Sequence, residues 1–338
     1  MSPVYKFSAP RKFTAGPTVY TSMLAGNTKY DNWTDVAASG DAGFITGNGT
    51  GNEWVSCFNH SVDNAWFSFG DLTATGMTGG GFNHNGGGAN ATRYLFMGAY
   101  GSGGPQNPIW YATVATKSAG SSFGTLASAR FAGAQMGNST KAMAYAGYLT
   151  SDIQTVNYAT TGNATVFGSA RQPHYNNGSS NSTTRAVSWG GQYGSQETTI
   201  DYVEFATTGN YNAFGTITSS NNHSGGGSNT RGLDIASTVS TTQLTSYITI
   251  ASTGNATNYG ALTVARWFVA TSSKASTYMV MFSGVTFASS GNTTTTTCDK
   301  FLISSTSNAI AWGTLTTGFL NGVGNCAGGQ NSNCHGGL

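Results

Sequence analysis

A pair of residues, an aromatic followed by glycine, recurs through the chain and constrains its fold more than any other feature. Six copies of the pair follow one another about 50 residues apart: Phe69-Gly70, Phe123-Gly124, Phe167-Gly168, Phe214-Gly215, Tyr259-Gly260 and Trp312-Gly313. A period of this length is typical of a four-stranded propeller blade and is too long for one coil of a leucine-rich solenoid. The spacing therefore predicts a chain built from six similar units.

Each unit can be divided into four short strands. In the third unit we expect strands over 131–137, 141–148, 153–161 and 165–171, because apolar residues there alternate with small or polar ones. Thr-Gly-Asn precedes the aromatic–glycine pair in three units, and Gly-Asn suits the positive φ of a hairpin turn. We interpret this turn and pair as the outer hairpin of a blade. The aromatic would fill the space between blades, and the glycine would permit close approach or a bulge.

The strand expected second in each unit also recurs, over 41–48, 92–101, 141–148, 184–194, 230–237 and 277–284. Six second strands match six fourth strands, so we expect a propeller of six complete blades over 30–318. Residues 1–29 would form an N-terminal arm or edge strand, and residues 319–338 a C-terminal closing segment. In the alternative arrangement, the two termini together form a seventh blade.

The composition favours a folded all-β chain. Glycine accounts for 48 of the 338 residues and charged side chains for only 8%, yet 12% of residues are aromatic. Disordered chains are poor in aromatic residues. The net charge of +2 gives no strong attraction to nucleic acid or an anionic membrane. No apolar run reaches the length of a membrane helix, and the first twenty residues contain no apolar core typical of a secretory signal, so we expect neither membrane insertion nor signal-dependent export.

One unit resembles a kelch repeat. Arg171-Gln-Pro-His174 leads into the segment 186–191 (AVSWGG), which is followed by Tyr202 and by Phe214-Gly215. The whole set resembles a divergent kelch-like β-propeller. The phrase TGNAT-x-(F/Y)-G-x-L-x-x-AR more closely resembles repeats of bacteriophage virion proteins, notably those of marine and cyanobacterial phages. The resemblance implies a structural protein on the exterior of a tail or capsid, in contact with other virion proteins and present in multiple copies.

The sequence contains no recognisable catalytic, cofactor or metal site. Its twelve acidic residues are scattered, with no close pair of the kind a glycosidase uses. Nucleophile-elbow, zinc-protease and P-loop motifs are absent from the sequence. We therefore expect a protein that is not an enzyme and that needs no cofactor. Near the C-terminus, Cys326 and Cys334 would form one disulfide or remain free thiols.

Two sets of residues are candidates for contact with a partner or glycan. Four cations open the second strands of four consecutive units, and would form an arc on one face of the disc: Arg93, Lys141, Arg185 and Arg231. They would either hydrogen-bond the carbonyls of their own loops or attract an acidic partner or sugar. Three tryptophans are candidate sugar platforms by residue type, or else core residues between blades: Trp110, Trp189 and Trp267.

Three functions fit these observations. The first is a phage virion protein, made in the host cytoplasm and exposed on the particle, which docks, decorates or recognises the host surface polysaccharide. Such a protein needs no export signal, and we expect this function. The second is a lectin-like adhesin, and the third is a glycan-degrading enzyme with a buried carboxylate pair in the central funnel.

Overall fold

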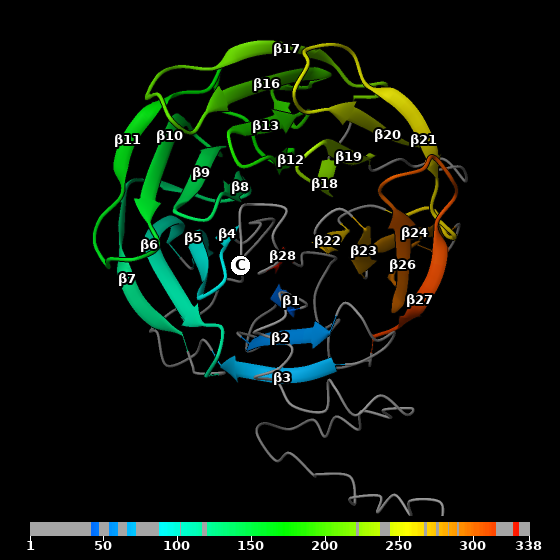
Figure 1. The fold of residues 1–338 in the computed structure, drawn as a ribbon, viewed down its shortest axis with the longest axis horizontal. Coiled ribbons are helices and arrows are strands. Elements are labelled where there is room, and N and C mark those ends of the chain that lie inside the picture. Colours follow the sequence, from blue (N-terminus) through cyan, green and yellow to red (C-terminus); the bar gives the residue numbers. More distant parts are fainter. Residues whose placement is uncertain are drawn as a thin grey trace, which may run out of the picture.

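The computed structural model is an all-β propeller in which four-stranded antiparallel sheets surround a common axis (Figure 1). It describes residues 42–46, 54–59, 66–71, 88–101, 103–116, 120–220, 223–236, 244–266, 269–274, 277–282, 284–288, 291–315 and 327–330. Among these residues, no helix is long and apolar enough to cross a lipid bilayer.

Five blades are made from consecutive segments of the chain, each with its first strand nearest the axis. Blade 1 contains β4 (Gly88–Ala89), β5 (Arg93–Gly101), β6 (Gly104–Thr113) and β7 (Ser121–Arg130). Blade 2 contains β8 (Ala134–Gly137), β9 (Lys141–Gly147), β10 (Thr150–Asn157) and β11 (Thr165–Ser169). Blade 3 contains β12 (Gly178–Asn181), β13 (Arg185–Trp189), β16 (Thr199–Glu204) and β17 (Asn212–Thr216).

Blade 4 contains β18 (His223–Gly227), β19 (Arg231–Ala236), β20 (Leu244–Thr249) and β21 (Thr257–Ala261). Blade 5 contains β22 (Ala270–Lys274), β23 (Tyr278–Phe282), β26 (Thr297–Leu302) and β27 (Ile310–Thr314). Two short hairpins interrupt this plan between the second and third strands of a blade. They are β14 (Gln192–Tyr193) with β15 (Ser195–Gln196) in blade 3, and β24 (Val285–Ala288) with β25 (Gly291–Thr294) in blade 5.

The remaining sheet joins the two ends of the described chain, and we call it the closing sheet. It contains β1 (Ala42–Thr46), β2 (Trp54–Asn59) and β3 (Trp66–Asp71), and its innermost strand is β28 (Ala327–Gln330), which pairs antiparallel with β1. The closing sheet lies between blade 5 and blade 1 (Figure 1).

This arrangement corrects the expected blade count. Five blades are continuous in sequence, and the closing sheet takes its first strand, β28, from residues 327–330. The expected six blades within 30–318 are therefore wrong, and so is the alternative of seven. The sequence pattern missed this exchange because AGGQ of β28 carries no aromatic–glycine signal. The segment 1–29, expected to be an arm, lies outside the described residues.

The strands expected second in each unit all occupy the second position of a sheet, and all six aromatic–glycine pairs lie on the outermost strand. In every four-stranded sheet the pairing register skips the aromatic residue, which is therefore the extra residue of a β-bulge. In blade 2, for example, Ile153 pairs with Gly168 and Gln154 pairs with Val166, so Phe167 is skipped.

The bulges direct the aromatic rings into a core that lies between neighbouring blades. Phe123 of blade 1 packs in one cluster with Ala142 and Val156 of blade 2. Phe214 of blade 3 likewise packs with Ile248 of blade 4. Each blade therefore buries its apolar side chains against the next blade, as expected for a repeat that cannot form a core alone.

The Thr-Gly-Asn turn holds neighbouring blades together. In blade 3 the turn lies against β11 of blade 2: Gly209 N donates to Phe167 O at 2.9 Å, and Asn210 Oδ1 accepts from Ser169 N at 3.1 Å. The same pattern joins blade 2 to blade 1 and blade 4 to blade 3. We call this contact the inter-blade clip. It gives the recurring Thr-Gly-Asn a second role beyond the hairpin turn.

In blades 1, 2 and 3 the clip requires the glycine of the aromatic–glycine pair. A Cβ added at Gly168 would lie 1.8 Å from Gly209 O, and one added at Gly215 would lie 2.2 Å from Gly254 O. The obstructing atoms belong to the backbone, so a side-chain rotation cannot relieve the overlap. The turn glycine Gly209, by contrast, has open space where a Cβ would lie. It has no positive φ, and neither has Asn210, which corrects the expectation that the Gly-Asn turn needs one.

The two sides of one clip should therefore respond differently to the same substitution. We expect Gly168→Ala to lower the free energy of unfolding by about 3 kcal/mol, because the methyl group must push two blades apart. Gly209→Ala should change it by less than about 0.5 kcal/mol. Urea unfolding of both variants measures the difference, and equal effects would show that the clip does not hold the blades together.

Candidate ligand-binding sites

The antiparallel order of the strands divides the propeller into two faces. Turns between first and second strands and between third and fourth strands lie on one face, which we call the turn face. Loops between second and third strands and the linkers between blades lie on the opposite face, the loop face. Any candidate site can be assigned to one of these two faces.

The row of cations expected at the start of the second strands lies on the turn face, and all four form ties between blades. The guanidinium of Arg185 lies 4.2 Å from the ring centre of Tyr202 in its own blade and donates to Ile250 O of the next blade at 2.8 Å. Arg231 repeats both contacts with Tyr247 and Ile303 O. In blade 1, Arg93 lies over Tyr111 and donates to a carbonyl of blade 2.

The alternative in which the cations bond carbonyls therefore describes their geometry, with one correction. We expected each cation to bond its own loop, but the acceptors belong to the neighbouring blade. The strand order alone could not show this, because the acceptor lies 64–72 residues further along the chain.

Lys141 of blade 2 departs from the pattern. Its Nζ donates to Phe205 O at 3.2 Å, as the arginines do to their own acceptors. The residue in the position of the stacked tyrosine, however, is Thr155. A lysine and a threonine are smaller than an arginine and a tyrosine, and a pocket of about 300 Å³ lies at this place.

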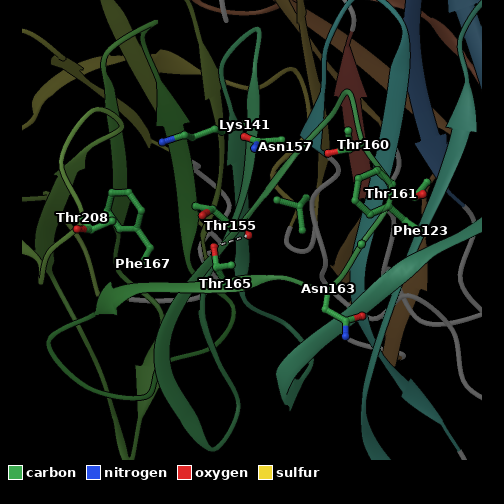
Figure 2. A pocket seen from close by; sticks show the side chains of 12 residues that line it. Phe123, Lys141, Thr155, Asn157, Thr160, Thr161, Asn163, Thr165, Phe167 and Thr208 are labelled. Atoms are coloured by element: carbon green, nitrogen blue, oxygen red, sulfur yellow. Dashed lines mark hydrogen bonds between the residues drawn. The ribbon is translucent and has the colours of Figure 1, made fainter.

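Hydroxyl, amide and aromatic groups line the pocket together with Lys141. Figure 2 shows Phe167 and Thr208 on one side and Phe123 and Asn163 on the other. The other lining residues are Thr155, Val156, Asn157, Thr160, Thr161, Gly162 and Thr165. None of the described lining residues is acidic. The site therefore offers hydrogen-bond donors and one positive charge to a small ligand.

The acidic residues with ion pairs serve the structure, either within one blade, as Glu204 and Asp234 do, or between a linker and the next blade. Arg171 of the linker after blade 2 contacts Asp201 of blade 3 at 2.5 Å, and Arg266 contacts Asp299 of blade 5 at 2.9 Å. Burial raises the pKa of Asp201, although the hydrogen bond and charge of Arg171 act to lower it. Among the described residues, no group of three or more His, Cys, Asp or Glu side chains could hold a metal ion.

The tryptophans do not form an exposed sugar platform in the described part of the chain. Trp189 is buried, and its indole lies against the inner strands, where a Cβ at Gly178 would meet it at 2.2 Å. Of the two alternatives for Trp189, the core residue between blades describes this position and the glycan contact does not. Trp110 is half-buried on β6 with its Nε1 buried. Trp267, Cys326 and Cys334 lie outside the described residues, so the expected disulfide stays a prediction.

Four aromatic rings form a continuous row across the loop face of blades 1, 2 and 3. Tyr100 contacts Phe131 at 4.8 Å, Phe131 contacts Tyr148 at 4.9 Å, and Tyr148 contacts Tyr175 at 5.3 Å between ring centres. We call this row the aromatic arc. None of its members is fully buried, and Tyr100 is 39% exposed. Rings of this kind combine an apolar face with a polar tip, which suits recognition.

The backbone beside the aromatic arc is unusually constrained. Within the described part of the chain, four non-glycine residues have positive φ: Ala132, Ala146, Leu149 and Asn176. Each lies within two residues of a member of the arc. Such conformations are unfavourable and cluster at functional sites. Sequence analysis missed the arc because its rings lie at strand ends and in linkers, outside the alternating pattern.

Comparison with known protein families and with curated proteins finds no match to this chain.

His174, next to Tyr175 of the arc, makes the stability of this region sensitive to pH. Burial, with a smaller contribution from the Arg171 charge, lowers the pKa of His174 from 6.5 to about 4. As the pH falls from 6.5 to 4, His174 therefore binds a proton in the unfolded chain while it stays neutral in the folded one. His174 favours folding above pH 6.5, and that contribution is lost as the pH falls toward 4.

We expect His174→Gln to reduce the loss of stability on acidification. Between pH 7 and pH 4.5, the unfolding free energy of the unsubstituted protein should fall by about 2 kcal/mol more than that of the variant. Urea unfolding of both proteins at the two pH values measures this difference. Parallel curves would show that the His174 pKa is not depressed in the fold.

Proposed function

We propose that this protein is a non-enzymatic structural component of a bacteriophage virion that recognises glycans on the host surface through its loop face. The virion part of this proposal depends on the resemblance of the TGNAT-x-(F/Y)-G-x-L-x-x-AR repeat to phage virion proteins. Other virion proteins are its proposed partners, and it is proposed to lie on the exterior of the tail or capsid.

The observation that carries the recognition role is the aromatic arc. Tyr100, Phe131, Tyr148 and Tyr175 offer adjoining apolar surfaces that water reaches. Sugar rings have apolar faces of carbon–hydrogen groups, which can pack on aromatic side chains, and their hydroxyls need nearby polar partners. Gln172 and Glu197, which are hydrogen-bonded to each other at 2.9 Å, provide such groups. Gln172 lies in the same linker as Tyr175, and Glu197 lies in the loop between the second and third strands of blade 3.

Differences between blades also favour recognition on the loop face. Its loops include a tight connection at Tyr148–Leu149 and the inserted hairpins β14–β15 and β24–β25. The turn face instead repeats one hydrogen-bonded turn from blade to blade, in which a side-chain oxygen caps the start of the second strand. The capping residues are Asn90, Asn138, Ser182 and Ser228. Binding functions commonly use variable loops on a rigid scaffold.

The first experiment measures binding of the purified protein to a panel of bacterial cells and their purified surface polysaccharides, at low and high salt. We expect saturable binding that high salt does not abolish, because stacking on the arc is not ionic. Tyr148→Ala and Tyr100→Ala should each weaken it about tenfold, as the loss of one important contact does.

Ile310→Ala is the matched control, since Ile310 is an exposed apolar residue on β27 of blade 5, away from the arc. It should bind like the unsubstituted protein. Binding that is insensitive to both tyrosine substitutions would remove the arc from the proposal. A complete absence of binding would contradict host recognition and leave docking or decoration as the role.

The virion location has a separate test. Antibodies against the purified protein should label the exterior of intact particles of the encoding phage in electron micrographs, in several places per particle. Labelling of cell debris but not of particles would contradict a virion protein, whatever the outcome of the binding experiment.

A further inference from the structure

Three blades fill the same place on the turn face with the same three-layer stack. An arginine lies over a tyrosine of the third strand, and that tyrosine meets the aromatic of the fourth strand edge-on. In blade 3 these residues are Arg185, Tyr202 and Phe214, with the two rings 5.9 Å apart. Blades 1 and 4 contain Arg93, Tyr111 and Phe123, and Arg231, Tyr247 and Tyr259. In each of these blades the tyrosine contacts both the cation and the outer ring.

Blade 2 keeps the first and third layers of this stack but lacks the second. Lys141 replaces the arginine, Phe167 is the outer ring, and Thr155 stands where the tyrosine would be. The pocket of about 300 Å³ includes all three residues in its lining. It is thus a cavity formed by the loss of one ring from a repeated stack.

The chemistry of the lining identifies a class of ligand. Of the three N–H donors of Lys141, one is directed to Phe205 O. The exposed side chains of Asn157, Thr160 and Thr161 add hydroxyl and amide groups, and Phe123 and Phe167 supply apolar surface. We propose that this pocket binds one carboxylate-bearing sugar unit, such as a uronic acid, with its carboxylate on Lys141.

Each part of such a sugar has a partner of suitable chemistry in the pocket. The carboxylate pairs with the ammonium group, and the ring hydroxyls exchange hydrogen bonds with threonine and asparagine side chains. The volume is near the lower limit for small-molecule sites, which suits one sugar ring rather than several. A bare anion would use the ammonium group alone, while the exposed hydroxyl and amide groups stayed bonded to water.

This inference does not depend on the proposed function. The pocket lies at the turn face, among the turn residues 160–163, whereas the aromatic arc lies on the loop face. Failure of either site leaves the other untouched, because the two share no residue.

The test compares four probes on the full chain at constant ionic strength: methyl glucuronide, methyl glucoside, acetate and inorganic phosphate. Calorimetry or saturation-transfer NMR measures each dissociation constant. We expect saturable binding of the glucuronide with a dissociation constant in the millimolar range or below, and at least tenfold weaker binding of the other three. Lys141→Met should abolish the preference for glucuronide over glucoside.

A double variant tests the pocket most directly, because it restores in blade 2 the arginine–tyrosine pair of three other blades. Lys141→Arg combined with Thr155→Tyr installs the pair found in blades 1, 3 and 4, so the new ring should fill the pocket without loss of stability. We expect this double variant to bind the glucuronide at least tenfold more weakly, with an unfolding midpoint equal to or above that of the unsubstituted protein. Ile310→Ala, on β27 of blade 5, should bind it normally.

Three results would overturn the proposal. The first is no saturable binding of the glucuronide. The second is equal binding of acetate or phosphate, which would show a general anion site. The third is unchanged binding by the folded double variant, which would place the sugar elsewhere on the protein.

Discussion

The inter-blade clip is the contact on which the architecture depends. A strand at the outside of a blade has free backbone groups along its edge, and such edges invite pairing with other chains. Here the bulge at the aromatic residue presents its carbonyl, and the turn of the next blade donates to it: Gly162 to Phe123, Gly209 to Phe167 and Gly254 to Phe214. One contact thus covers the edge, sets the distance between blades and requires the glycine of the aromatic–glycine pair in blades 1, 2 and 3.

Charged residues reinforce the same junctions. With few charged side chains available, the chain places several of them between blades, as in the buried pair of Arg266 and Asp299 and the tie from Arg185 to Ile250 O. Burial lowers the pKa of the Arg266 guanidinium, while the nearby Asp299 acts to raise it. Breaking such a pair leaves a buried charge uncompensated, which costs far more than losing an exposed one. These side chains are held in the scaffold, and the proposed binding sites lie elsewhere.

Both proposed sites occur where the repeat is interrupted. The aromatic arc occupies strand ends and linkers, which the blade pattern does not specify, and the pocket occurs where Thr155 replaces a tyrosine. A repeat protein can vary such positions at little structural cost, because each blade is supported by its neighbours. Departures from a repeat are therefore informative about function in a chain of this kind, and residues that obey the repeat are informative about stability.

The sequence alone determined the all-β class, the position of the second and fourth strands and the Thr-Gly-Asn turn before three of the aromatic–glycine pairs. These features are local, because alternation and turn chemistry act within one unit. Only the tertiary structure decided that β28 joins β1, that Trp189 is buried and that Arg185 bonds Ile250 O. It also brought Tyr100, Phe131, Tyr148 and Tyr175 into one row. Each of these contacts joins residues from different blades or from the two chain ends, and no local pattern encodes which distant residues the closure of a ring brings together.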